Sequence, residues 1–398
     1  MPDNTPPAPR LGRNVIILSI VSLLTDASSE IIYPLLPIFL TNVLGAGASA
    51  VGAIEGAAET TSALLKLASG WWSDRASRRK PLVVAGYALA SLARPLVALA
   101  QSAGQVLAIR LTDRVGKGIR GAPRDALIAE SVDPSIRGRA FGFHRAADNA
   151  GAVIGPLVAF ALLRWEDLPL RTVFLLAAIP GLLSVLVLVM GVRETPRDTV
   201  PKAESKGAPV LRGVPLGGSF WTFLSSVFLF TLGNSTDAFL ILRANQLGVS
   251  VALVPILWAA LHVVKSGAAI PGGALSDRLG RKPLILAGWA VYAAVYYAFG
   301  VATQTWHAWA LFLTYGLFFG LTEGTERAMV ADLVRRDRRG TAFGWYNLAI
   351  GIGALPASLL FGFAWDRWGP AAAFNIGAAF AAAAAALMIA VPARAAEA

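Results

Sequence analysis

Charged side chains inside an apolar segment are the feature of this chain that most directly indicates chemistry. At 100° per residue of helix, Arg110, Arg114, Lys117 and Arg124 fall within an arc of about 80°. A row of cations like this cannot face lipid, and it would attract a carboxylate or phosphate group. We therefore expect residues 104–130 to form a helix with one wet or salt-bridged face. The ionisable residues of this segment are Arg110, Asp113, Arg114, Lys117, Arg120, Arg124 and Asp125.

Carboxylates occur in other apolar segments. Asp26 and Glu30 lie one helical turn apart in residues 15–40, with Tyr33 on a nearby face. Two carboxylates this close in a partly dry site do not both ionise easily, so one of them is expected to hold a proton. The candidate proton carriers are Asp26, Glu30, Asp237 and Glu323.

Two further sets of charges are better explained by local pairing along one helix. Glu55, Glu59 and Lys66 share one face, and Arg145 and Asp148 lie one turn apart. We expect these residues to pair within their own segments, because buried charges are usually paired.

These residues must be positioned by membrane-spanning helices. The chain has 398 residues, of which 56% are hydrophobic and 15% charged, and soluble domains carry nearer a quarter charged residues. Apolar runs of about 20 residues, the length that crosses the hydrocarbon core, recur throughout. The twelve predicted spans are 15–40, 48–72, 82–101, 104–130, 138–163, 171–193, 219–243, 249–275, 283–302, 306–333, 339–364 and 370–392.

The distribution of positive charge predicts the orientation of these spans. The loops after even-numbered spans, together with the two termini, hold 21 of the 35 Lys and Arg residues, and the opposite loops hold three. By the positive-inside rule both termini lie in the cytoplasm. The net charge of +11 therefore reflects membrane topology, and we expect no nucleic-acid partner. The first span is too long for a signal peptide, so we expect it to remain in the mature protein.

Composition also argues against several kinds of chemistry. The chain contains no cysteine and only three widely spaced histidines, so we expect no disulfide, metal or other cofactor. The sequence shows no nucleophile–base pair, which makes an enzyme the least expected class, and no nucleotide-binding signature.

A repeated motif shows that the chain is built from two related halves. The first copy reads Gly70-Trp-Trp-Ser-Asp74-Arg75-Ala-Ser77-Arg78-Arg79-Lys80-Pro81. The second copy reads Gly273-Ala-Leu-Ser-Asp277-Arg278-Leu-Gly280-Arg281-Lys282-Pro283. Each copy lies between two apolar segments, as expected for parallel repeats of six spans.

Other segments repeat in the same order. Glu130 and Asp332 end matching segments, and Arg124-Asp125 corresponds to Glu326-Arg327 with the charge order inverted, as in a lock between the halves. A polar, proline-containing stretch separates the repeats and is predicted to be a cytoplasmic linker. The predicted units are residues 1–193, 194–217 and 218–398.

The two motif copies make the chain similar to the major facilitator superfamily of transporters, and the resemblance covers nearly the whole length. The family pattern is Gly-x-x-x-Asp-Arg-x-Gly-Arg-Arg/Lys, and the first copy departs from it at Ser77. The resemblance implies an all-α membrane protein with two parallel six-helix bundles, in which spans one, four, seven and ten line a central cavity. We expect a monomer in the bacterial inner membrane.

The resemblance also implies roles for the charged residues. The predicted substrate-binding residues are Tyr33, Arg110, Arg114, Lys117, Arg120, Asn234 and Lys265. The predicted gating residues are Gly70, Asp74, Arg75, Arg78, Arg124, Asp125, Gly273, Asp277, Arg278, Arg281, Glu326 and Arg327.

The function predicted from these features is secondary active transport of a small charged or amphiphilic organic solute by alternating access, coupled to protons. Two alternatives stay open. One is a multidrug efflux pump. The row of cations argues against a pump whose drugs are purely cationic. The other is a non-transporting membrane sensor on the same scaffold, which would normally bring an added soluble domain.

Overall fold

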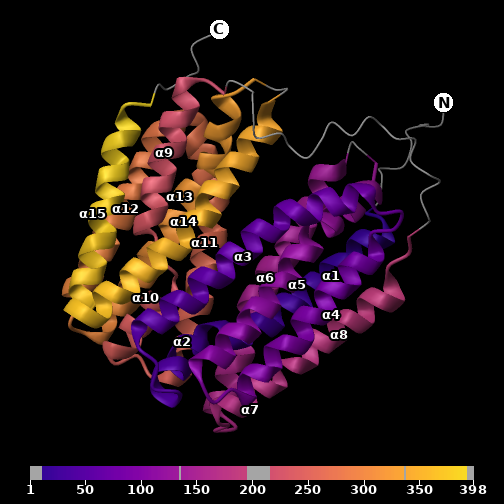
Figure 1. Cartoon of the computed structure of the whole chain (residues 1–398), viewed down its shortest axis with the longest axis horizontal. Helices are drawn as coiled ribbons and strands as arrows, with labels where there is room; N and C mark the ends of the chain where they lie inside the picture. The colour runs from indigo at the N-terminus through magenta and orange to yellow at the C-terminus, as the bar shows by residue number, and fades with distance from the viewer. Residues whose placement is uncertain (1–10, 134–135, 195–215, 336–337, 392–398) are drawn as a thin grey trace, which may run out of the picture.

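The computed structural model describes residues 11–133, 136–194, 216–335 and 338–391, with the side chains of Leu67, Gly70, Trp71, Asp74 and Arg75 left aside. Within these residues the chain is helical and has no strand. The helices form two bundles that lie side by side (Figure 1). The predicted all-α membrane fold is therefore confirmed.

The first half contains six membrane-crossing stretches, several of them broken into consecutive helical elements. They are α1 Arg13–Ile32 with η1 Tyr33–Leu35, α2 Leu36–Ile38 and η2 Phe39–Val43; α3 Ala48–Arg75; α4 Lys80–Ala93 with η3 Arg94–Leu99; α5 Ala103–Glu130; α6 Arg137–Arg164; and α7 Leu170–Leu176 with α8 Ala178–Gly191.

The second half repeats this order. Its stretches are α9 Gly218–Gly233 with α10 Ala238–Gln246; η5 Val251–Leu253 with α11 Val254–Leu279; α12 Arg281–Val301; α13 Thr305–Asp332; α14 Arg339–Trp368; and α15 Pro370–Ile389. The predicted linker falls mostly outside the described residues, and its boundaries remain predictions.

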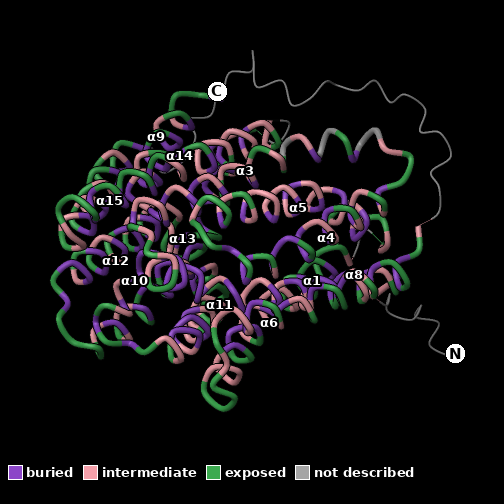
Figure 2. Tube along the Cα trace, turned by 60° about the horizontal axis from the view of Figure 1, so that its bottom comes forward, coloured by how far each residue is buried: buried purple, intermediate pink, exposed green. Residues whose placement is uncertain are grey.

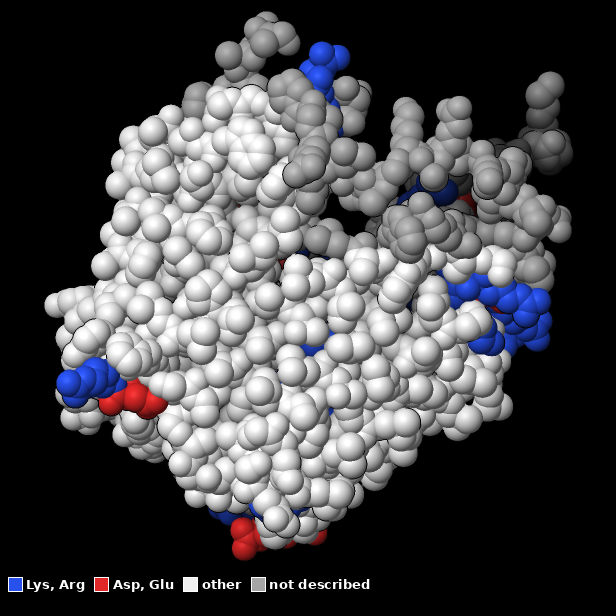
Figure 3. Space-filling model, in the orientation of Figure 1, with Lys and Arg blue, Asp and Glu red and all other residues white. Residues whose placement is uncertain are grey.

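The composition of the helices separates two kinds of span. In the described part of the chain, nine stretches are long and apolar enough to cross a membrane by themselves. The other three, α3, α5 and α13, each carry several of the charged residues discussed above, while Asp26, Glu30 and Asp237 lie in apolar spans. Across the middle of the face drawn in Figure 3, charged side chains are almost absent, as on a lipid-facing surface.

The two halves touch most closely at the end away from the termini, where α2 and α10 lie (Figure 1). There Asp366 of α14 accepts hydrogen bonds from the backbone N–H groups of Ala48 (2.9 Å) and Ser49 (2.8 Å) at the start of α3. This carboxylate caps the helix and satisfies donors that a helix start leaves open. Figure 2 shows α3 beside α14 and α6 beside α11, the two helix pairs that join the halves.

The two motif copies fold into matching arrangements. Lys80 Nζ donates to the carbonyl oxygens of Val189 (2.8 Å) and Val192 (2.7 Å) at the end of α8. Lys282 Nζ donates in the same way to Ile389 (2.6 Å) and Val391 (2.7 Å) at the end of α15. The arginines that precede these lysines also have equivalent partners. Arg79 binds Glu130, and Arg281 binds Asp332. The internal repeat predicted from the sequence is thus a structural repeat.

Candidate functional site

A charged cavity of about 660 Å³ lies between the two halves. The end where the two halves touch most closely is called the closed end below. The cavity extends from Tyr33 and Trp258, near the closed end, to Arg145 and Arg327, nearer the end that carries the termini. Nine Lys and Arg side chains line it, against six Asp and Glu side chains. Its charged lining residues are Lys66, Arg110, Arg114, Lys117, Arg120, Arg124, Arg145, Lys265 and Arg327, with Asp26, Glu30, Asp125, Asp148, Asp237 and Glu323.

The wall formed by α5 is basic, as the spacing of its cations predicts. Arg114 and Lys117 form no ion pair with any residue that the structure describes, and the Arg114 Nε atom is buried without a hydrogen-bond partner there. Glu59 of α3 interacts with both cations electrostatically. Arg120 stacks over the Tyr87 ring at 4.2 Å, and its Nη1 atom is also unpartnered among the described residues. This wall is therefore equipped to receive an anionic group.

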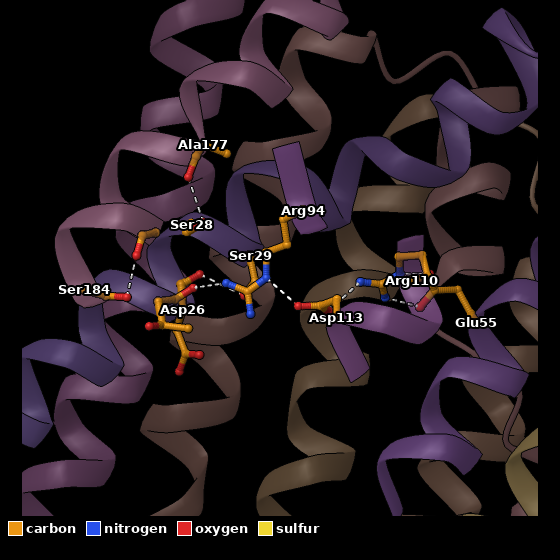
Figure 4. A network of polar contacts seen from close by, with 11 residues as sticks. Asp26, Ser28, Ser29, Glu55, Arg94, Arg110, Asp113, Ala177 and Ser184 are labelled. Atoms are coloured by element: carbon orange, nitrogen blue, oxygen red, sulfur yellow. Dashed lines mark hydrogen bonds and ion pairs between the residues drawn. The ribbon is translucent and has the colours of Figure 1, made fainter. Parts of the chain in front are cut away.

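Behind this wall, four buried residues form a continuous ionic network (Figure 4). Arg94 Nε donates to Asp113 at 2.7 Å, and Arg110 lies 3.5 Å from the other Asp113 oxygen. Arg110 also donates to both carboxylate oxygens of Glu55, at 2.9 and 2.7 Å. Arg94 extends the network to α1 by donating to the Thr25 carbonyl oxygen at 3.0 Å. The network ties together the first four spans.

This network corrects the expected local pairing of Glu55. Glu55 binds Arg110 of α5 and not a residue of its own helix, because α3 and α5 pack against each other. Arg110 does line the cavity, as predicted, but its guanidinium is already held by two carboxylates. The expected pairing of Arg145 with Asp148 is confirmed at 3.8 Å.

All four predicted proton carriers line the cavity, with different partners. Glu30 accepts a hydrogen bond from the Trp258 indole at 2.8 Å, and Asp237 accepts one from the Tyr315 hydroxyl at 2.7 Å. Glu323 lies 3.3 Å from Lys265 and 3.7 Å from Arg327. The Asp26 carboxylate has no hydrogen bond or ion pair with the described residues, although it interacts electrostatically with Lys117, Arg120, Arg124 and Asp148.

Two predictions about the second half do not match the geometry. Asn234 does not line the cavity, because α9 ends one residue earlier, at Gly233, and the chain turns before α10 begins at Ala238. The suggested lock between the halves is absent among the described contacts. Arg124 binds Asp125 at 2.9 Å, and Glu326 accepts from Trp289 (3.0 Å) and Tyr346 (2.8 Å) within its own half. The halves stand apart at this level of the cavity, which explains why these charges find nearby partners.

Part of the predicted gate is described. Arg281 binds Asp277 and Asp332, while Arg78 and Arg278 are exposed and a side chain at Gly273 would meet open space. The surroundings of Gly70 and the side chains of Asp74 and Arg75 are outside what the structure describes.

Three residues that shape the site were not singled out from the sequence: Arg94, Trp258 and Tyr315. A single arginine within the otherwise apolar residues 82–101 was a signal for Arg94, because such a residue needs a buried partner. Trp258 and Tyr315 gave no signal, since aromatic residues are common in membrane spans. Within the described residues, no group of His, Asp or Glu is arranged to hold a metal ion.

Comparison with known proteins agrees with this architecture. The Major Facilitator Superfamily profile matches residues 18–355 and 222–398. An uncharacterized MFS-type transporter of Methanocaldococcus jannaschii is 34% identical over 361 residues, which cover 89% of each chain. The multidrug resistance protein MdtH of Escherichia coli is 32% identical over 116 residues, or 29% of each chain. The crystal structure of the nucleoside transporter NupG matches with a TM-score of 0.80 and 13% identity, over 95% of this chain and 99% of that one.

Two helical halves around a charged cavity are the architecture of a membrane transporter. The chain belongs to the Major Facilitator Superfamily.

Proposed function

We propose that this transporter is a proton-coupled carrier of a small charged or amphiphilic organic solute that bears an anionic group. The observation that supports this most directly is the basic wall of α5, where Arg114 and Lys117 face the cavity without an ion-pair partner among the described residues. Cations held in a shielded site bind carboxylate or phosphate through charge-assisted hydrogen bonds.

The acids of the same cavity support the proton part of the proposal. Asp26, Glu30 and Asp237 share the cavity with the basic wall, and each lies in a membrane-crossing stretch of the chain. A carboxylic acid in such a place can take a proton on one side of the membrane and release it on the other. Movement of the proton would then drive the solute, with the two halves rocking around the cavity.

Substrate affinity should depend on the cations of α5. We expect Lys117→Gln and Arg114→Gln each to weaken binding about tenfold or more, since a hydrogen bond to a charged group contributes about 1.5–3 kcal/mol. A thermal-shift screen of purified protein against anionic, zwitterionic and cationic metabolites and drugs would first identify a ligand. The affinities of the variants for that ligand would then be measured by calorimetry.

The matched control for this experiment is Arg164→Gln. Arg164 is exposed at the end of α6 and does not line the cavity, so its loss should leave the affinity unchanged. A ligand that is a lipophilic cation, and that binds the Lys117→Gln variant more tightly than the parent, would contradict the proposal.

That contrary result would favour multidrug efflux, the second candidate function. The partial relative MdtH, described as a multidrug resistance protein, supports this alternative. The excess of cations over acids in the cavity supports the anion carrier more strongly.

We further propose that the protein lies in the bacterial inner membrane with both termini in the cytoplasm. The positive-inside distribution of Lys and Arg supports this orientation, in which the closed end of the structure faces outward. A reporter enzyme that is active only outside the cytoplasm, fused after Ala398, should give no signal. An active fusion would contradict the orientation.

A further inference from the structure

We infer that Trp258 is a positioning residue that links the proton on Glu30 to the closure of the two halves, an inference that rests on the proposed proton-coupled function. Trp258 belongs to α11 in the second half, and Glu30 belongs to α1 in the first half. The indole Nε1–H donates to Glu30 Oε2 at 2.8 Å across the boundary between the halves. Parting the halves at this end must break this bond.

The donor of this bond, the Trp258 indole, is held in place. The Trp258 ring is 4% exposed and lies 5.2 Å from the Tyr33 ring of the first half. The Arg110 guanidinium lies over the Tyr33 ring, 5.7 Å from its centroid. Glu55 binds this guanidinium and holds it there. The buried ionic network of the first half therefore supports the surface on which Trp258 rests.

The strength of the bond depends on the charge of its acceptor. A hydrogen bond to an ionised carboxylate is roughly twice as strong as one between neutral groups. Ionised Glu30 therefore favours the closed arrangement seen here, and a proton on Glu30 weakens the bond and favours parting of the halves. The structure thus assigns Trp258 a role that a purely packing residue would not have.

Other charged groups also face Glu30. Asp26 lies one turn away on α1, and Arg114 and Lys117 act on it from α5. From α6, Gly155 packs against the Glu30 Cβ, and Asp148 acts on Asp26. On α11, the centroid of the His262 ring lies 5.1 Å from that of the Trp258 ring, and Lys265 lies one turn further along. Among the hydrogen bonds of the Glu30 side chain in the described residues, the indole bond is the one that crosses between the halves.

The predicted effect can be measured without any substrate. The chain has no cysteine, so Gln101→Cys and Thr303→Cys would introduce the only two labelling sites. Both positions are exposed at the closed end, one in each half. Nitroxide labels there, measured by double electron–electron resonance in lipid nanodiscs, report the fraction of molecules with a short distance between the halves.

In the otherwise unchanged chain, the ratio of closed to open molecules should rise about fivefold to tenfold between about pH 5.5 and about pH 8, the difference between a charged and a neutral acceptor. Glu30→Gln should lower the closed fraction and remove the pH response. Trp258→Phe keeps an aromatic ring beside Tyr33 but lacks the donor, and it should also remove the response.

The matched control is Trp289→Phe, which removes an indole that donates to Glu326 at 3.0 Å within the second half. It should keep the full pH response. The inference is overturned if the parent shows no response, or if the response survives in Glu30→Gln or in Trp258→Phe. Failure of the transport proposal is distinguishable, because it would appear as an absence of proton-driven uptake while the distances still respond to pH.

Discussion

Replacing Asp113 by asparagine is expected to lower the free energy of unfolding by about 3–5 kcal/mol, the cost of breaking a buried ion pair from one side. The Asp113 side chain is 2% exposed and binds two arginines, Arg94 at 2.7 Å and Arg110 at 3.5 Å. Without its charge, both guanidinium groups keep a buried charge that is only partly compensated. Thermal unfolding of purified protein in detergent, followed by tryptophan fluorescence, would measure the loss.

The control is the same substitution at Asp125, on the same helix. The Asp125 side chain is 50% exposed and pairs with the adjacent Arg124, so Asp125→Asn should change stability by less than about 1 kcal/mol. Equal stability of the Asp113 and Asp125 variants would mean that the network in Figure 4 contributes little to holding the first four spans together.

A second large effect is expected at Glu30. Glu30→Gln should abolish accumulation of substrate driven by a pH gradient, because glutamine cannot carry a proton through the cycle. Exchange of labelled for unlabelled substrate at equal concentrations should continue, since exchange needs no net movement of protons. Uptake into liposomes, with and without an imposed gradient, separates the two activities.

Glu166→Gln is the corresponding control, because Glu166 is an exposed residue between α6 and α7 at the closed end. It should accumulate substrate like the parent. Accumulation by Glu30→Gln that still follows the gradient would remove Glu30 from the proton path. It would shift attention to Asp26, whose carboxylate has no direct partner among the described residues, or to Glu323.

The α5 wall was predictable because helical periodicity places residues that recur at intervals of three and four on one face. Arg110, Arg114, Lys117, Arg120 and Arg124 all line the cavity, as the spacing indicated. The repeat was equally visible, since both motif copies begin with Gly-x-x-Ser-Asp-Arg and end with Arg-Lys-Pro, with one additional residue in the first copy. Periodicity and repetition are properties of one segment or of two aligned segments, and a single sequence contains both.

Contacts between helices that are distant in sequence could not be predicted in this way. Glu55 was expected to find a partner on its own helix, but it binds Arg110, because packing brings α3 against α5. The Trp258–Glu30 bond joins residues 228 positions apart and carries no local pattern. Asn234 was placed on the cavity face by assuming an unbroken helix, which actually ends at Gly233.

The lysines of the two motif copies have a mechanical consequence. Lys80 and Lys282 each bind carbonyl oxygens at the end of the last helix of their own half, where an ammonium group also complements the helix dipole. These bonds tie the third membrane-crossing stretch of each half to its sixth, which stiffens each half against internal deformation. We therefore expect rotation of one half against the other to meet less resistance than deformation within a half. The resistance to that rotation is then set by the contacts that cross between the halves, which include those of Asp366 and Trp258 and the packing of α3 against α14 and of α6 against α11.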